Sequence, residues 1–87
     1  MAREIFGVIK ISSERNDGYT DDSFFVGIST DTNKHIQIST CASPINAMKF
    51  LMDFEREKID FLMDFIRKFY PRKNHKVSFV EVEMNFN

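Results

Sequence analysis

Beyond its carboxylates, the sequence offers three side chains suited to metal ligation or to Cys–His chemistry: His35, His75 and Cys41. No two of them have the spacing that places two ligands on one helix face or in a zinc knuckle. Cys41 precedes an expected helix start, where a helix dipole can activate a thiol. A small residue that fills a strand-to-helix corner is the simpler interpretation.

The acidic residues offer two further arrangements. Asp17, Asp21 and Asp22 lack the alternating spacing and the closing glutamate of a calcium-binding loop. Glu81 and Glu83 share one face of an expected strand, but no neighbouring motif would form a pocket around them, so they indicate a solvated face. We therefore predict no metal, no cofactor and no enzymatic activity.

The formal charge of -1 conceals a basic segment at residues 67–76, which holds five cations and no acid. Cations interleaved with aromatic rings can contact phosphates and stack a base, although cations at the end of a helix also stabilise its dipole without any ligand. Nucleic-acid binding is therefore an alternative hypothesis. The residues assigned to it are Arg67, Lys68, Tyr70, Arg72, Lys73 and Lys76.

A polar segment at residues 13–22 contains Asn-Asp-Gly and is longer than a tight hairpin turn. This composition predicts a mobile loop. Its acidic and tyrosine side chains are the predicted contacts with a target protein: Glu14, Asp17, Tyr19, Asp21 and Asp22.

Alternation of apolar and polar residues predicts four strands, at residues 3–12, 23–30, 35–40 and 77–86. In the second strand, Phe24, Val26 and Ile28 are expected to point inward. Turn-forming residues at 31–34 join the second strand to the third.

A helix is predicted over residues 44–70, because Ser43-Pro44 is a good start signal and Pro71 forbids continuation. Phe-Leu-Met-Asp-Phe at residues 50–54 recurs at 61–65, eleven residues later, so both copies would face the same side of one helix.

This expected helix carries more apolar surface than one sheet requires. A stripe of Phe and Leu is expected to pack on the sheet, and a second stripe is left to contact a second copy of the chain. The alternative is a break near residues 55–58, with both stripes buried internally. The predicted dimer contact is Met48, Met52, Ile59, Met63 and Ile66.

Together these elements predict one α+β domain over residues 1–87. A four-stranded, mostly antiparallel sheet in the order β-β-β-α-β is expected to carry one long amphipathic helix on one face. The last strand is expected beside the first and parallel to it, after a right-handed crossover, which gives the sheet order 3-2-1-4.

The composition, 43% hydrophobic with three Gly and two Pro among 87 residues, argues against disorder. A single cysteine favours a reducing, cytoplasmic compartment, and neither a signal peptide nor a membrane span is expected. Scarce Ala beside abundant Phe, Ile, Lys and Asn is typical of a low-GC bacterium or its phages.

We therefore predict a non-enzymatic protein-binding domain whose partners are a second copy of itself and an unidentified protein target. It would act as a homodimeric accessory or stoichiometric inhibitor, for example a phage protein that blocks a host enzyme or defence system. The alternatives are an RNA- or DNA-binding module that uses the basic segment, and a small-ligand binder with a cavity between helix and sheet.

Overall fold

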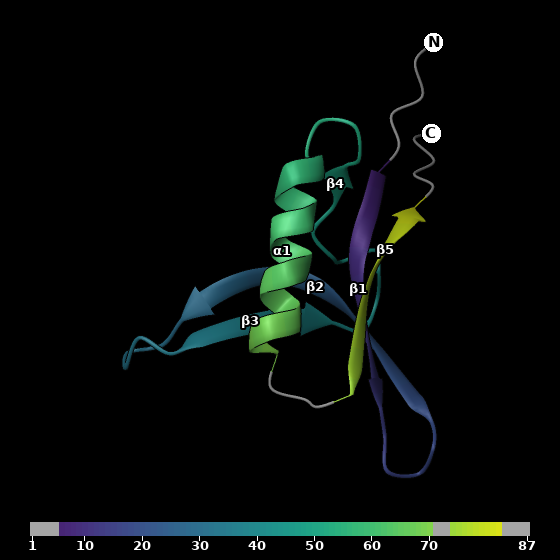
Figure 1. The fold of residues 1–87 in the computed structure, drawn as a ribbon, viewed down its shortest axis with the longest axis vertical. Helices are drawn as coiled ribbons and strands as arrows, with labels where there is room; N and C mark the ends of the chain where they lie inside the picture. The colour runs from purple at the N-terminus through teal and green to yellow at the C-terminus, as the bar shows by residue number, and fades with distance from the viewer. Residues whose placement is uncertain (1–5, 71–73, 83–87) are drawn as a thin grey trace.

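The computed structural model describes residues 6–70 and 74–82. In this part of the chain, five strands form one antiparallel sheet, and a single helix packs on one of its faces (Figure 1). The elements are β1 (Phe6–Glu14), β2 (Thr20–Thr30), β3 (Ile36–Cys41), β4 (Phe50–Leu51), α1 (Arg56–Phe69) and β5 (His75–Val82). The predicted α+β class is confirmed, with one short strand, β4, more than the sequence indicated.

β1 is the central strand of the sheet. β5 pairs with it along one edge, while β4 and β2 pair with its first and last residues on the other edge, and β3 lies outside β2. The last strand therefore lies beside the first, as predicted, but it runs antiparallel. The predicted parallel orientation is wrong.

The orientation of β5 follows from an additional pass of the chain along the sheet. After β3, the chain returns through residues 42–51 to form β4, which is antiparallel to β1. α1 then runs back to the opposite end of the sheet, where β5 begins (Figure 1). This extra reversal makes β5 antiparallel to β1, whereas one long helix directly after β3 would have made it parallel.

α1 begins at Arg56, so the predicted helix over residues 44–55 is wrong, while the break considered near residues 55–58 coincides with its start. Ser43 Oγ accepts the Ile45 N–H at 3.3 Å, but only isolated turns follow. Lys49 Nζ donates to the Ile45 carbonyl at 2.6 Å, and the Met48 N–H donates to Phe25 O at 3.0 Å. Backbone groups that a helix would pair internally are thus bonded elsewhere.

The two copies of Phe-Leu-Met-Asp-Phe adopt different structures. The second copy lies within α1, whereas the first forms β4 and the turn after it. Phe50 is 1% exposed, and its ring is stacked on that of Phe25 with centroids 6.4 Å apart. The Glu55 carboxylate accepts the Leu51 N–H at 2.7 Å, and the Glu55 N–H donates to Leu51 O at 2.9 Å. Tertiary contacts therefore override the shared local preference.

The core lies between α1 and the sheet. A bulge in β2 between Phe25 and Gly27 shifts the alternation of that strand, so that Phe25 enters the core instead of the expected Phe24 and Val26, which are half-buried. The core residues are Ile9, Ile11, Phe25, Phe50, Ile59, Leu62 and Ile66.

α1 ends where the sequence predicts. Tyr70 has an extended backbone, with φ -68° and ψ 128°, and precedes Pro71 in the sequence. The Tyr70 N–H still donates to Ile66 O at 2.9 Å. Among the described residues, no helix has both the length and the apolar character that crossing a membrane requires.

Gly7 in β1 allows a close approach between strands. It is paired with Glu81 of β5, and the Phe79 ring from the same strand lies directly over the Gly7 backbone, where any Cβ would overlap it. Phe79 in turn packs against the core. Gly27 is also within a strand, but a Cβ there meets no atom within 4 Å.

We predict that Gly7→Ala lowers the free energy of unfolding by about 1–3 kcal/mol, because the Phe79 ring must shift. Gly27→Ala is the matched control and should change it by no more than about 1 kcal/mol. Urea denaturation followed by circular dichroism measures both. Equal effects of the two substitutions would show that the close approach at Gly7 does not constrain the fold.

Candidate interaction surface

α1 packs on the sheet through aliphatic side chains. Ile59, Leu62 and Ile66 are 4%, 8% and 0% exposed, respectively. Phe61 and Phe69 are 67% and 54% exposed. Within residues 56–69, the spacing of Ile59, Leu62 and Ile66 with the half-buried Met63 is the i, i+3, i+4, i+7 pattern of an amphipathic helix.

The helix is therefore rotated relative to the prediction, which expected phenylalanine on the sheet. Ile59 and Ile66, two members of the predicted dimer contact, are core residues, and Met63 packs partly buried against that core. Met48 and Met52 precede α1 and do not belong to its face. The five residues do not form one surface stripe, because the helix that would have aligned them begins only at Arg56.

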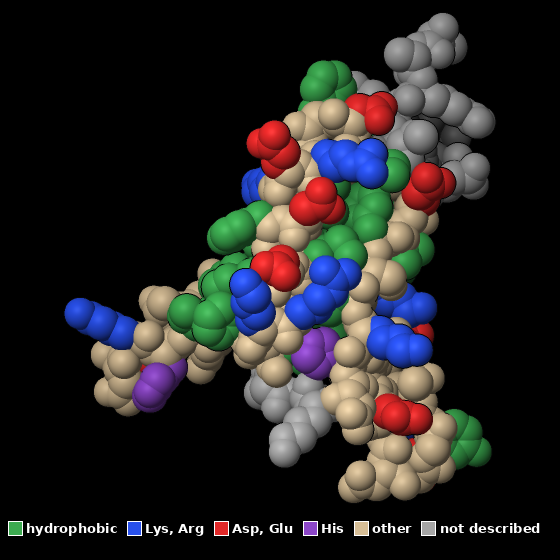
Figure 2. Space-filling model, viewed as in Figure 1, with side chains coloured by type: hydrophobic (Ala, Val, Ile, Leu, Met, Phe, Trp, Pro, Cys, Tyr) green, Lys and Arg blue, Asp and Glu red, His purple; other side chains and the backbone are tan. Residues whose placement is uncertain are grey.

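Phe61, Phe65 and Phe69 form an aromatic ridge along one flank of α1. The ring centroids of Phe61 and Phe65 are 6.4 Å apart, and those of Phe65 and Phe69 are 4.6 Å apart. Residues four apart advance only about 40° around a helix, so the three rings follow one line. Hydrophobic side chains gather along the flank remote from β5, above the β2–β3 hairpin (Figure 2).

The outer part of the β2–β3 hairpin, residues 28–38, projects beside α1 and is called the hairpin arm here (Figure 1). Ile28 is paired with Ile38, and Ile36 with Thr30, so these isoleucines lie on one face of the arm. Ile38 packs against the core, whereas Ile28 and Ile36 are 41% and 48% exposed. The arm thus extends the apolar, helix-bearing face of the sheet beyond the core.

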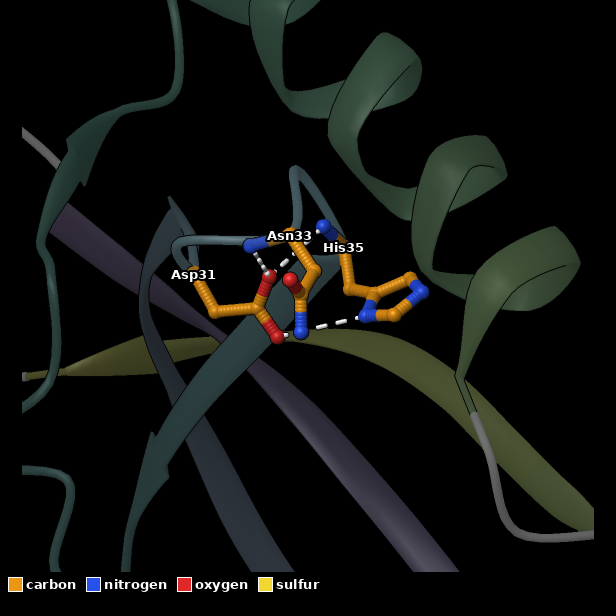
Figure 3. Close-up of polar contacts among 3 residues, drawn as sticks. All are labelled: Asp31, Asn33 and His35. Atoms are coloured by element: carbon orange, nitrogen blue, oxygen red, sulfur yellow. Dashed lines mark hydrogen bonds and ion pairs between the residues drawn. The ribbon is translucent and has the colours of Figure 1, made fainter.

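Asp31 organises the tip of the hairpin arm (Figure 3). Its Oδ1 accepts the N–H groups of Asn33 and His35, each at 2.9 Å, and its Oδ2 lies 3.3 Å from His35 Nδ1. Lys34 has a φ of +63° and donates its N–H to Asp31 O at 3.0 Å. Turn chemistry at residues 31–34 is confirmed, and the Asp31 carboxylate closes the turn that joins the two strands.

The β1–β2 hairpin brings the predicted target-binding residues together. Glu14 ends β1 and Thr20 begins β2, so the loop is residues 15–19 and the longer loop predicted over 13–22 is wrong. The Arg15 guanidinium lies 3.4 Å from Asp17 and 3.6 Å from Asp21.

Further contacts balance the acidic charge of this hairpin. Lys10 Nζ is 3.7 Å from the Asp22 carboxylate, and Ser12 Oγ donates to the same carboxylate at 2.8 Å. Tyr19 projects from the loop and is 71% exposed. Target binding by these residues stays a prediction, on a surface where acids alternate with cations.

The basic segment is divided between two elements. Arg67 and Lys68 lie in the last turn of α1, and Lys76 lies on β5, while Arg72 and Lys73 fall outside the described residues. The Lys68 ammonium is 3.1 Å from the Asp64 carboxylate.

A ring contact joins the two ends of this segment. The Tyr70 and His75 rings meet edge to face with centroids 5.0 Å apart, which brings the end of α1 to the start of β5. Nucleic-acid contact by this segment stays an alternative hypothesis.

Among the described residues, no three His, Cys, Asp or Glu side chains are grouped to hold a metal ion. The Cys41 thiol donates to Ser43 O at 3.1 Å, within the corner after β3. An open depression lies at the start of α1, lined by residues 53–58 and Asp60, with charges of both signs.

Within residues 6–70 and 74–82, fold and surface define a small α+β domain with exposed apolar side chains on one side. Comparison of the chain with protein-family models, with curated proteins and with solved structures returns no match.

The rotation of α1 yields a direct prediction. Ile66→Ala should lower the free energy of unfolding by about 2–5 kcal/mol, because it opens a cavity beneath the helix. Phe61→Ala on the exposed flank should cost less than about 1 kcal/mol in the monomer. Denaturation at low protein concentration measures both, and the reverse ranking would mean that phenylalanine faces the sheet.

We also expect Asp31→Ala to loosen the tip of the hairpin arm. The loss of two backbone N–H bonds in an exposed turn should cost about 1 kcal/mol. Asp31→Asn keeps an acceptor oxygen and should retain most of that stability. Amide hydrogen exchange at Asn33 and His35 reports the change, and unaltered exchange in the alanine variant would contradict it.

Proposed function

We propose that this chain is a non-enzymatic protein-binding domain that works as a homodimer. In the cytoplasm of a low-GC bacterium or its phage, it would assist or stoichiometrically inhibit a larger protein. The observation that carries the proposal is the aromatic ridge, whose outer rings are more than half exposed beside the apolar face of the hairpin arm.

The energetics of the aromatic ridge support binding. Burying a phenylalanine ring removes about 150–250 Å² from water, at about 25 cal/mol per Å² of apolar area. Aromatic residues are enriched in the buried centres of protein interfaces, and apolar patches with polar rims mark such contacts. Glu57, Asp64 and Lys68 lie on the outer side of the ridge and supply a rim of that kind.

The position of the aromatic ridge supports self-association. Hydrophobic side chains gather on the flank of α1 above the β2–β3 hairpin (Figure 2), and Ile28 and Ile36 of that hairpin are also exposed. One apolar surface laid against both the ridge and the arm would cover the two at once. A second copy offers such a surface, since its own hairpin arm carries the same isoleucines.

The test is the oligomeric state of ridge variants. We expect Phe61→Ser with Phe69→Ser to raise the dimer dissociation constant at least tenfold in sedimentation equilibrium, since two exposed rings leave the contact. The monomer should keep its stability to within about 1 kcal/mol, because neither ring belongs to the core.

Arg67→Ser, an exposed substitution in the same helix but outside the ridge, is the control and should leave the dissociation constant unchanged. A wild-type chain that stays monomeric at high concentration would overturn the proposal. A ridge variant that dimerises as tightly as the wild type would show that the aromatic ridge is not part of the dimer contact.

A further inference from the structure

β3 is an open edge of the sheet. Within residues 6–70 and 74–82, it pairs with β2 alone, and it stands at the end of the strand order. Its sequence, Ile-Gln-Ile-Ser-Thr-Cys, contains neither a charge nor a proline, and the bulge of this pair lies in β2. Sheet edges exposed to water are normally protected by such features. β5, by contrast, carries Lys76 and Glu81.

The backbone of β3 is oriented for a further strand. The Asp31 N–H donates to His35 O at 3.1 Å, which sets the alternation of the hairpin ladder. In an antiparallel ladder, successive residues direct their N–H and C=O groups to opposite sides. Gln37 and Ser39 therefore face β2, while Ile36 and Ile38 direct their backbone groups to the open edge.

The hairpin arm consists of two strands without a third beside them. The pairing of β1 with β2 extends from Thr20 to Phe24 of β2, so among the described strands the arm contains β2 and β3 alone. Two-stranded hairpins are marginally stable in water, and a third strand makes them substantially more stable. An added strand would stabilise the arm and pair the open backbone groups of β3.

We infer that two copies of this chain pair through β3, antiparallel about a two-fold axis at Ile38, so that their sheets become continuous. This inference rests on the proposed homodimer and names its contact. Ile38 would face its own counterpart, Ile36 would face Thr40 of the partner subunit, and Gln37 would face Ser39 of the partner subunit. Ile36, Ile38 and Thr40 thus remain on the helix-bearing face, and Gln37 and Ser39 on the other face.

Charge favours a second copy as the occupant. Because β3 is uncharged, a two-fold axis through it places no like charges opposite each other. Antiparallel pairing directs the two charged hairpin tips, each with Asp31, Lys34 and His35, toward opposite ends of the new contact. The isoleucines of each arm would then lie on the same face of the continuous sheet as the aromatic ridge of the partner subunit.

The outer edge of β2 is open over a shorter length than that of β3. Just before the arm, the segment after β3 contacts β2, where the Met48 N–H donates to Phe25 O at 3.0 Å. A strand added along β2 would meet that segment at Phe25, whereas β3 has its outer edge open along its described length. The two edges therefore provide an internal comparison.

Proline substitutions at the paired residues Thr30 and Ile36 test the pairing of β3 with β3 of the partner subunit. Ile36→Pro removes an N–H from the outer edge of β3, and Thr30→Pro removes the equivalent N–H from the outer edge of β2. We expect the dimer dissociation constant to rise about tenfold or more for Ile36→Pro, because the two-fold axis doubles each lost bond. Thr30→Pro, the matched control, should change it little, and circular dichroism checks that both variants fold.

A charge exchange tests the register without proline. One variant carries Gln37→Lys with Ser39→Lys, and the other carries Gln37→Asp with Ser39→Asp, at exposed positions that face each other across the axis. Each variant alone should dimerise at least tenfold more weakly than the wild type, and an equimolar mixture should form a heterodimer.

The outcomes separate the two proposals. Strand pairing would be overturned if the mixture forms no heterodimer and Ile36→Pro leaves the dimer unaffected. If that dimer still requires the aromatic ridge, the homodimer is mediated by the helix instead. A monomeric wild type would overturn both.

Discussion

The packing of three aliphatic side chains of α1 against the sheet governs the arrangement of the rest of the molecule. Ile59, Leu62 and Ile66 enter a core formed by β1, β2 and β4, and their positions set the rotation of the helix. With fourteen residues, α1 covers only part of the sheet, and the β1–β2 and β2–β3 hairpins extend beyond it (Figure 1). The phenylalanines are therefore displaced to its flank, and the hairpin arm extends beyond its cover.

The segment between β3 and α1 determines which side chains of the helix pack against the sheet. Lys49 and Glu55 bond to backbone groups of this segment, and Phe50 is buried against Phe25. These contacts hold residues 42–55 out of a helix and bring the chain back along β1. The start of α1, its rotation and the antiparallel direction of β5 all follow from that return.

Period-two alternation and turn residues were sufficient to place the three strands of the meander, and Pro71 placed the end of the helix. A right-handed crossover placed the last strand beside β1 correctly but gave it the wrong direction. Local patterns were insufficient where the same five residues occur twice, because local preference is identical at Phe50 and Phe61 and only burial distinguishes them. The error in the start of the helix then misassigned its faces. Within the true helix, the spacing from Ile59 to Ile66 does indicate the buried side.

The bulge in β2 had the same kind of effect on a smaller scale. It places Phe25 and Ile28 on one face, although strict alternation would separate them. The predicted dimer stripe combined core residues with residues outside α1, so it could not form one surface. The candidate surface depends instead on where a short helix stops covering a longer sheet, which residue periodicity alone does not specify.

Amide hydrogen exchange at increasing protein concentration tests directly, and without substitution, whether a second copy of the chain completes the β3 edge. The Ile36 and Ile38 amides should become protected as the dimer forms, while those of Ile28 and Thr30 on the opposite edge of the arm should not. Protection of both pairs to the same degree, or of neither pair in a chain that dimerises, would contradict it.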